Sequence, residues 1–257
     1  MGLYGLTDGA CISRPRARCL MERFFNQLQT IDVQQPVVRN IVSIRQSQDL
    51  FDDLSNSPDD WAAAQHVEDT VKPPPYSSHS PVIDRPFEDA AWFNAVQWPF
   101  DHWQSNRYSN GKFGVWYGSA QAETTVYETV YHWYSGFLRD AGFETESVVG
   151  ERKLYNVTCS AMLLDFRPAF LSEPRLRHGT DYSFSQQVGA RLHSEGHPGL
   201  LTHSVRHEGG ENFVIFNSKV LSEPKLLCQV TYRVEGQHIR IEKQVGVEWM
   251  SIPRDTF

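Results

Sequence analysis

The sequence predicts an α+β domain built around a mixed or antiparallel β-sheet with flanking helices. The chain has 257 residues with 40% apolar content, which is enough for one large domain with a buried core. Segments with a strand pattern outnumber those with a helical pattern, and the strands come in clusters instead of alternating with helices. No internal repeat is found, so a solenoid is not indicated.

The N-terminal part is predicted to be an extension that leads into the first strand. Residues 1–36 combine turn formers with one short amphipathic piece, residues 20–28, and end at Pro36. VVRNIVSIR, residues 37–45, alternates β-branched and polar residues as a half-buried strand does, and Arg45 stands at its end. We therefore expect an extension over residues 1–36 and a single domain over residues 37–257.

Short helices and a long loop are predicted next. QDLFDDL and residues 61–69 suit brief helices or turns, whereas KPPPYSSHSPVIDRP, residues 72–86, is too rich in Pro and Ser for regular structure. Five aromatic residues then crowd into twelve positions, and core packing is favoured over a ligand platform for them. They are Trp92, Phe93, Trp98, Phe100 and Trp103.

A strand over residues 112–117 and a helix capped by Ser119 follow. Val126, Val130, Trp133 and Phe137 recur at helical spacing, which predicts that all four share one apolar face.

The rest of the chain is mostly strands. LYNVTCSAMLLDF predicts a strong strand, and residues 182–195 predict a helix that ends at Gly196. GLLTHSV and NFVIF predict two strands with a turn at Gly209 and Gly210. LLCQVTYRV and HIRIEKQVGVEW alternate like a final hairpin.

Charge and composition exclude several classes of protein. The chain carries 24 Lys plus Arg against 31 Asp plus Glu, so its net charge of −7 disfavours a broad nucleic-acid-binding surface and leaves room only for a local basic pocket. The chain lacks a signal-peptide core and a run of about 20 apolar residues, so we expect a cytoplasmic protein outside the membrane. A Walker loop and a GxGxxG motif are absent, which argues against a P-loop NTPase and a Rossmann oxidoreductase.

Metal-binding patterns are weak. The four cysteines contain no CxxC pair, and we expect them to be reduced and structural. Four histidines fall at spacings of four, six and four residues: His193, His197, His203 and His207. Gly196 and Pro198 interrupt the helix that would place the first two imidazoles on one face, so we expect no metal site.

The most informative segment is RYSNGKFGVWYGSAQAETTVYE, an aromatic strand that leads into a helix. It carries Arg107, Tyr117 and Glu128 at intervals of ten and eleven residues. Taken singly, each side chain has a common structural explanation: a surface arginine, a core tyrosine and a solvated glutamate. Together they can hold a phosphate, stack on a flat ring and stabilise a developing cation, which indicates a charged nucleotide as the ligand.

RYSNGKFGVWYGSAQAETTVYETVYH and HPGLLTHSVRHEGGENFVIFNSKVL together resemble the RES-domain family, named for its Arg, Glu and Ser. The resemblance extends from about residue 40 to about residue 236 and implies a fold similar to that of ADP-ribosyltransferases. By resemblance, Arg107, Tyr117, Glu128 and Ser204 match the family's motif residues, and Arg45 matches its early strand arginine.

The resemblance implies a bacterial toxin that cleaves the nicotinamide–ribose bond of NAD+ by hydrolysis or phosphorolysis and so depletes cellular NAD+. Arg45 and Arg107 would bind the pyrophosphate, Tyr117 would pack on a ribose or the nicotinamide, and Ser204 would hydrogen-bond the substrate. Glu128 would stabilise the oxocarbenium-like transition state, and the reaction requires no metal or cofactor besides NAD+ as substrate.

Several alternatives stay open on the sequence alone. The acceptor can be water, phosphate or a protein, the last making the chain a mono-ADP-ribosyltransferase. A noncatalytic binding protein on the same scaffold is a further alternative. The resemblance also implies a cognate helix-turn-helix antitoxin as partner, without direct nucleic-acid binding by this chain, and does not decide whether the chain forms homo-oligomers.

Overall fold

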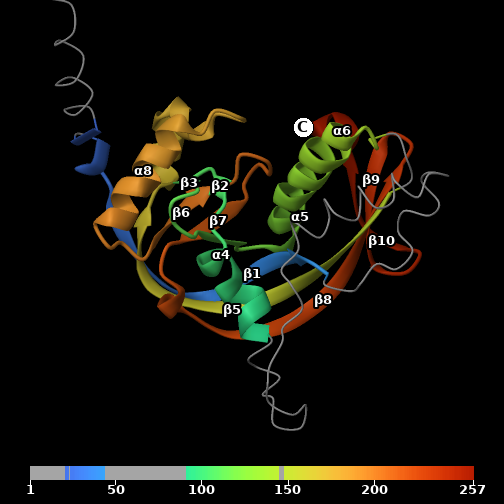
Figure 1. Cartoon of the computed structure of the whole chain (residues 1–257), viewed down its shortest axis with the longest axis horizontal. Helices are drawn as coiled ribbons and strands as arrows, with labels where there is room; N and C mark the ends of the chain where they lie inside the picture. Colours follow the sequence, from blue (N-terminus) through green and yellow to red (C-terminus); the bar gives the residue numbers. More distant parts are fainter. Residues whose placement is uncertain (1–20, 23, 44–90, 145–147) are drawn as a thin grey trace, which may run out of the picture.

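The computed structural model describes residues 21–22, 24–43, 91–144 and 148–257. Three long curved strands form the base of the molecule (Figure 1). The middle strand, β5, pairs antiparallel with β1 from Arg152 to Asp165 and with β8 from Val149 to Cys159. Their bounds are β1 Gln29–Val42, β5 Val149–Asp165 and β8 Leu221–Glu235.

Shorter strands complete the large sheet. The order β1-β4-β7-β6-β5 and the additional β1–β5 pairing close a circuit, while β9 and β10 extend the sheet beyond β8. Within the described part of the chain, β5 and β6 form the one parallel pair, so the sheet is mixed. The bounds are β4 Trp116–Ser119, β6 Gly199–His203, β7 Glu211–Ile215, β9 His238–Gln244 and β10 Val247–Pro253; β2 Ser105–Asn106 and β3 Ser109–Asn110 pair separately.

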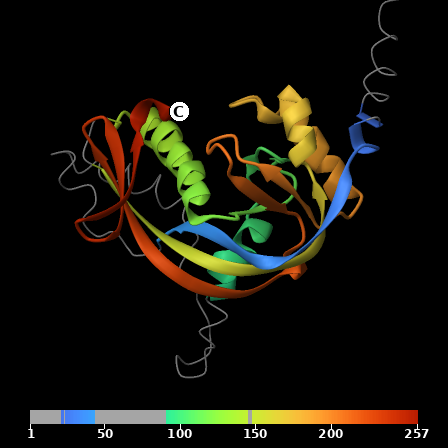
Figure 2. The same cartoon turned by 180° about the vertical axis from the view of Figure 1, so that it is seen from behind.

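Two arms rise from the opposite ends of the long strands (Figures 1 and 2). One arm holds α8 over β6 and β7, and the other holds α5 and α6 beside β9 and β10, with the C-terminus next to α6. The helices are α4 Trp98–Asp101, α5 Ala122–Val130, α6 Arg139–Ala141, α7 Arg167–Ser172 and α8 Ser183–Ser194; a π-helical segment, η3 Tyr131–Leu138, joins α5 to α6. A second π-helical segment is η2 Phe93–Gln97, and the 3-10 helices are η4 Pro174–Arg177, η5 Ser218–Val220 and η6 Arg254–Thr256.

Each arm has its own hydrophobic core. Val188 and Leu192 of α8 are fully buried against Leu200 and Val214 of the sheet. On the other arm, Val130 and Leu138 belong to a cluster that includes residues of β8, β9 and β10. Burying one such aliphatic side chain contributes about 1.5–3 kcal/mol, so both arms are firmly attached to the base and hold fixed walls on either side of the space between them.

The first strand begins earlier than predicted. β1 starts at Gln29, and Pro36 lies within it opposite Thr158 of β5. Among the described residues, the other edge of β1 pairs with β4 only at Val38, so Pro36 lies at an edge position, where proline is tolerated. The predicted start of this strand at residue 37 is therefore wrong, because β1 already includes Pro36. Phe24 and Phe25, also in the predicted extension, pack against the α8 core.

The predicted apolar face of the long helix is correct only in its first half. Val126 and Val130 are buried, but the next buried residues are Tyr134 and Leu138 instead of Trp133 and Phe137. A π-helix closes i→i+5 hydrogen bonds, so its wider turn moves each buried position about one residue further along the chain. Trp133 and Phe137 consequently lie at the wall of a cavity.

Ser119 does not cap this helix. The N-cap residue is Gln121, without a side-chain cap bond, and Ser119 is the last residue of β4. The strand predicted over residues 112–117 shortens to β4, which begins at Trp116.

Most later predictions are confirmed. The strand over residues 154–166 and the helix over residues 182–195 correspond to β5 and α8, and the two strands joined at Gly209 and Gly210 are β6 and β7. The predicted final hairpin is three strands, because a turn at Gly246, whose φ is +79°, separates β9 from β10. The mixed-sheet α+β prediction is therefore confirmed.

Other predictions are met in part or cannot be compared. Trp92 and Phe100 pack against the core, as expected for the aromatic cluster, whereas Trp103 is 57% exposed. Arg45, the short helices of residues 46–69 and the loop of residues 72–86 lie outside the described residues. In the part of the chain that the structure describes, no helix combines the length and apolarity needed to cross a bilayer.

Candidate active site

A cavity of about 540 Å³ lies between the two arms. Its walls come from β1, β4, α5, η3, β5, β6 and β7, and from the loop that precedes α8. Its size is typical of a site for a small molecule. Arg107, Tyr117 and Glu128 line the cavity, and Ser204 contacts Glu128 from a neighbouring loop. The fold therefore brings together the four predicted site residues that it describes.

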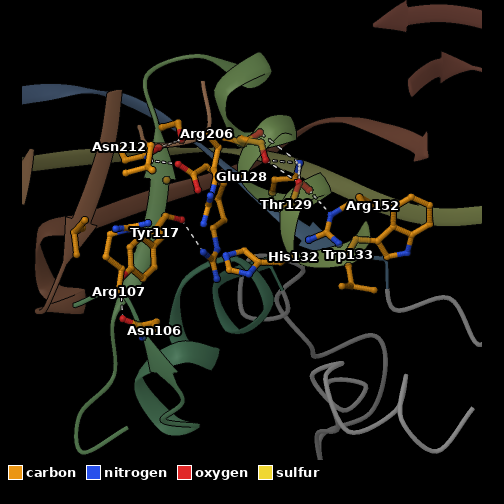
Figure 3. Close-up of a pocket in the computed structure, with 18 of the residues that line it drawn as sticks. Asn106, Arg107, Tyr117, Glu128, Thr129, His132, Trp133, Arg152, Arg206 and Asn212 are labelled. Atoms are coloured by element: carbon orange, nitrogen blue, oxygen red, sulfur yellow. Dashed lines mark hydrogen bonds between the residues drawn. The ribbon is translucent and has the colours of Figure 1, made fainter. Parts of the chain in front are cut away.

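Glu128 stands in the middle of this group of side chains (Figure 3). Its Oε1 accepts a hydrogen bond of 2.7 Å from the Ser204 hydroxyl and one of 2.6 Å from Nδ2 of Asn212. No hydrogen bond from a described residue reaches Oε2. One carboxylate oxygen is thus fixed by the protein, while the other remains available to a ligand.

Ser204 is held by its own loop. Its hydroxyl oxygen accepts hydrogen bonds from the backbone N–H groups of Arg206 and His207, both at 3.0 Å, and its own N–H donates to the Gly210 carbonyl. The single hydroxyl proton is donated to Glu128, so Ser204 positions the carboxylate and cannot donate to a substrate at the same time.

Gly210 lets the Ser204 loop approach helix α5. A Cβ atom on Gly210 would lie 2.7 Å from the Thr124 side chain, which is closer than real Cβ contacts allow. His207 attaches the same loop to α5, because its ring stacks on Tyr127 and its Nδ1 lies 2.9 Å from the Thr124 hydroxyl. The distance between Ser204 and Glu128 is therefore fixed by packing of the loop on the helix.

Asn212 is a site residue that the sequence analysis missed. It lies directly opposite Ser119 in the pairing of β7 with β4, and its Oδ1 accepts a 2.6 Å hydrogen bond from the Ser119 hydroxyl. That bond turns the amide nitrogen towards Glu128. Only the strand register creates this arrangement, so no local sequence pattern could have shown it.

Tyr117 forms the wall on one side of Glu128, together with Asn106 and Arg107 (Figure 3). Its hydroxyl donates to Oδ1 of Asn106 at 2.7 Å and accepts from the backbone N–H of Tyr108 at 3.2 Å. Burial, followed by the neighbouring Tyr108, raises the pKa of Tyr117 well above its usual value. Tyr117 is thus a neutral, fixed aromatic wall.

Arg107 both lines the cavity and holds the loop before α8. Its Nη1 donates to the carbonyls of Leu176 and His178, and its guanidinium lies 4.4 Å from the ring centroid of Tyr182. Arg206 holds the same loop from the other direction, since it donates to the Gly179 carbonyl and stacks on Tyr131. These two arginines therefore contribute positive charge at a wall that they also stabilise.

Two further arginines, Arg39 and Arg152, line the cavity from the base strands. Nη1 of Arg39 donates to the Tyr117 carbonyl at 2.6 Å, while its buried Nε has no partner among the described residues. Burial, together with the positive charge of Arg152, lowers the pKa of Arg39 to about 10. Arg39 lies on β1, whereas Arg45, which the sequence predicts to bind phosphate, lies outside the described residues.

His132 lies close to Glu128 at the cavity wall (Figure 3). Loss of solvent around the ring lowers its pKa, and the charges of Arg206, Arg152 and Arg107 act in the same direction. The Glu128 carboxylate opposes this effect. The net direction of the pKa shift favours the neutral imidazole.

The four histidines singled out in the sequence have separate surroundings. His193 stacks on Phe113, His203 lies against Phe170, and His207 stacks on Tyr127. His197 lies 3.5 Å from a Glu195 oxygen. Within the described ranges, no three metal-binding side chains converge on a common point.

The site combines the fixed Glu128 carboxylate with positively charged side chains around it. Four arginines and two glutamates, Glu128 and Glu151, line the cavity. Such a site can hold an anion with several oxygens and can place a carboxylate beside an atom that becomes positive during a reaction.

Comparison with known proteins places the chain in a family. A model described as the RES domain matches residues 82–235, which is more than half of the chain. A search of curated proteins finds no match. Among solved structures, a chain of the "M.tuberculosis MbcT-MbcA toxin-antitoxin complex" is similar at 15% identity, covering 82% of this chain and 91% of that chain, with a TM-score of 0.45. Since the family model matches more than half of the chain, including Arg107, Glu128 and Ser204, the protein belongs to the RES-domain family.

Proposed function

We propose that the protein is a toxin that cleaves the bond between nicotinamide and ribose in NAD+ and thereby depletes the cellular NAD+ pool. The observation that carries the proposal is the placement of Glu128, held at one oxygen by Ser204 and Asn212, in a cavity that four arginines line. NAD+ has the matching chemistry, because it combines an anionic pyrophosphate with a cationic ring on a ribose.

The proposed reaction breaks the C–N glycosidic bond. The bonding electron pair leaves with nicotinamide, which becomes neutral, and positive charge develops on the ribose as an oxocarbenium-like ion. A water oxygen then bonds to the anomeric carbon and releases a proton, which gives free ADP-ribose. The Glu128 carboxylate stabilises the developing cation and accepts a hydrogen bond from a ribose hydroxyl through Oε2.

The surrounding side chains have distinct roles in this proposal. Arg39 and Arg107 bind pyrophosphate oxygens, and Arg45, outside the described residues, keeps the same role as a prediction. Tyr117 packs against the nicotinamide or its ribose. Ser204 and Asn212 act on the substrate through Glu128, because their donor atoms point at its carboxylate.

The experiment is release of nicotinamide from NAD+ by the purified protein. Wild type is expected to release nicotinamide, and Glu128→Gln is expected to lower kcat about a hundredfold or more, because an electrostatic stabiliser of the transition state is lost. Glu123→Gln is the matched control, since Glu123 lies on the same helix outside the cavity lining. Equal rates for wild type and Glu128→Gln would contradict the proposal.

The product identifies the acceptor. Free ADP-ribose indicates hydrolysis, ADP-ribose 1-phosphate indicates phosphorolysis, and label transferred from NAD+ to a macromolecule indicates an ADP-ribosyltransferase. A noncatalytic scaffold would release no nicotinamide and would show no thermal stabilisation by NAD+.

A cognate antitoxin stays a prediction that accompanies this function. A protein that destroys NAD+ requires an inhibitor in its own cell, and the cavity between the arms is the place where an inhibitor would block substrate. Co-expression with the product of the adjacent gene is expected to restore growth, and the same product is expected to stop nicotinamide release in vitro.

A further inference from the structure

The cavity continues past Glu128 on the side away from Tyr117. Thr129, Trp133 and Arg152 lie on that side, while Asn106, Arg107 and Tyr117 lie on the other (Figure 3). We call this part the Trp133 lobe and define it by its lining residues Val42, Trp133, Phe137, Val148, Gly150 and Arg152. Because Glu128 stands between the two parts, a ligand with its reactive bond at Glu128 extends into the lobe.

The lobe offers a flat apolar surface. The Trp133 indole rests on the backbone of Gly150, where an added Cβ would lie 3.1 Å from indole atoms. Trp133 and Phe137 are only partly buried in the core beside Val148, and both line the cavity. The π-helical turn of η3 is what points them there, and such turns are frequent at functional sites. A planar aromatic ring fits this surface by stacking and edge contacts.

Arg152 supplies a cation at the same place. Its Nε donates to Oδ1 of Asn40 at 2.7 Å, and its guanidinium lies 5.7 Å from the Tyr232 ring. Neither Glu151 nor any other carboxylate of the described residues forms an ion pair with it. Arg39 faces the same cavity and repels it. Two arginines with like charge and no carboxylate partner favour a ligand with phosphate oxygens.

We propose that the Trp133 lobe binds the nucleoside monophosphate half of the dinucleotide that does not react, with its base against Trp133 and Phe137 and its phosphate on Arg152. The inference rests on the proposed function for the identity of the dinucleotide. The cationic nicotinamide is excluded from the lobe by the charge of Arg152, whereas an adenine is neutral. Arg107 on the opposite side directs its donors at two carbonyls, so its charge is partly compensated.

Binding of AMP, measured by calorimetry, tests the lobe without catalysis. Arg152→Gln and Trp133→Leu are each expected to weaken AMP binding about tenfold or more. Arg175→Gln is the matched control, because Arg175 is an exposed arginine paired with Glu173 and is expected to leave AMP affinity unchanged. Equal affinity of wild type and Arg152→Gln, or no binding of AMP to wild type at millimolar concentration, would overturn the inference. If Arg152→Gln lacks a cooperative thermal transition, Trp133→Leu decides, and equal AMP affinity of wild type and Trp133→Leu would overturn the inference.

A truncated substrate separates this inference from the proposed function. Nicotinamide mononucleotide keeps the reactive bond and lacks the adenylate, so Arg152→Gln is expected to lower the ratio of kcat/KM for NAD+ to kcat/KM for nicotinamide mononucleotide about tenfold. An unchanged ratio together with unchanged AMP affinity would refute the lobe and leave the NAD+ reaction standing. Lobe-dependent AMP binding without nicotinamide release from either compound would refute the reaction and support the lobe.

Discussion

The two sides of the cavity differ in how their polar groups are satisfied. On the Glu128 side, the carboxylate accepts two short hydrogen bonds, and the Tyr117 hydroxyl both donates and accepts. In the Trp133 lobe, Arg152 makes one hydrogen bond to a neutral amide and no ion pair among the described residues. The Glu128 side therefore holds its polar atoms in fixed positions, whereas the Trp133 lobe has a positive charge that no described carboxylate neutralises.

Both arrangements follow from the same physical rule. A catalytic carboxylate is effective when its position is fixed before the reaction, so its supporting donors belong to the protein. An arginine that binds a phosphate gains most when its donors are not already used by carboxylates. Each side can therefore be disturbed separately, and the expected effects differ in kind.

The largest effect is expected from removing the donors to Glu128. A hydrogen bond to a charged group contributes about 1.5–3 kcal/mol, so Ser204→Ala and Asn212→Ala should each lower kcat about tenfold or more. The double variant should lose about a hundredfold, with KM little changed, because both residues act on the same carboxylate. Steady-state kinetics of nicotinamide release measures this, with Ser194→Ala, an exposed serine on α8, as the control.

A different kinetic result would contradict the positioning role of Ser204. If Ser204→Ala raises KM and leaves kcat unchanged, Ser204 contacts the substrate directly instead of positioning Glu128.

The next effect concerns the affinity of the cavity for the phosphates of ADP. ADP at about a hundred times its Kd should stabilise the wild type by about 2.7 kcal/mol, which corresponds to a Tm increase of several degrees. Arg39→Gln should at least halve this increase. It removes one of the two arginines, Arg39 and Arg152, that line the cavity without an ion pair among the described residues. Thermal unfolding with and without ADP measures the shift. The same increase in Arg39→Gln as in wild type would mean that Arg39 serves only to hold the Tyr117 carbonyl.

A smaller effect is expected from Ser119, which touches Glu128 only through Asn212. Ser119→Ala removes one neutral hydrogen bond worth about 0.5–1.5 kcal/mol, so kcat should fall about two- to tenfold. The loss should vanish in the Asn212→Ala background, which a double-mutant cycle measures. Additive losses would show that Ser119 acts independently of Asn212.

The smallest effect is expected on folding stability at high pH, where two buried tyrosines, Tyr117 and Tyr232, are compared. Burial raises the pKa of both Tyr117 and Tyr232 above the usual value of 10. Above pH 10 the unfolded chain loses these protons while the folded chain keeps them, so stability is fully present below pH 10 and falls as pH rises above it. Tyr117→Phe and Tyr232→Phe should each flatten this decline, Tyr117→Phe more strongly, in urea midpoints measured between pH 8 and 11. Identical slopes in wild type and both variants would contradict burial of the two phenols.

Sequence patterns were reliable where structure depends on neighbouring residues. The strand pattern over residues 154–166 and the helical pattern over residues 182–195 both predicted the right element. The pattern failed at Trp133 and Phe137, because a π-helical turn shifts the buried position and nothing in the local spacing signals that turn. The pattern also placed the start of the first strand too late in the chain. The first residues of β1 are in a strand because they pair with β5, and their own periodicity does not show it.

The sequence by itself determined the classes of element, the resemblance to a RES domain and the choice of Arg107, Tyr117, Glu128 and Ser204. Only the tertiary structure decided that Ser204 and Asn212 meet at one oxygen of Glu128, and that Arg39 and Arg152 face the same cavity. The physical reason is strand register. Ser119 faces Asn212, and Val42 faces Arg152, through pairings between segments about a hundred residues apart, and such pairings are set by packing of the whole sheet rather than by local periodicity.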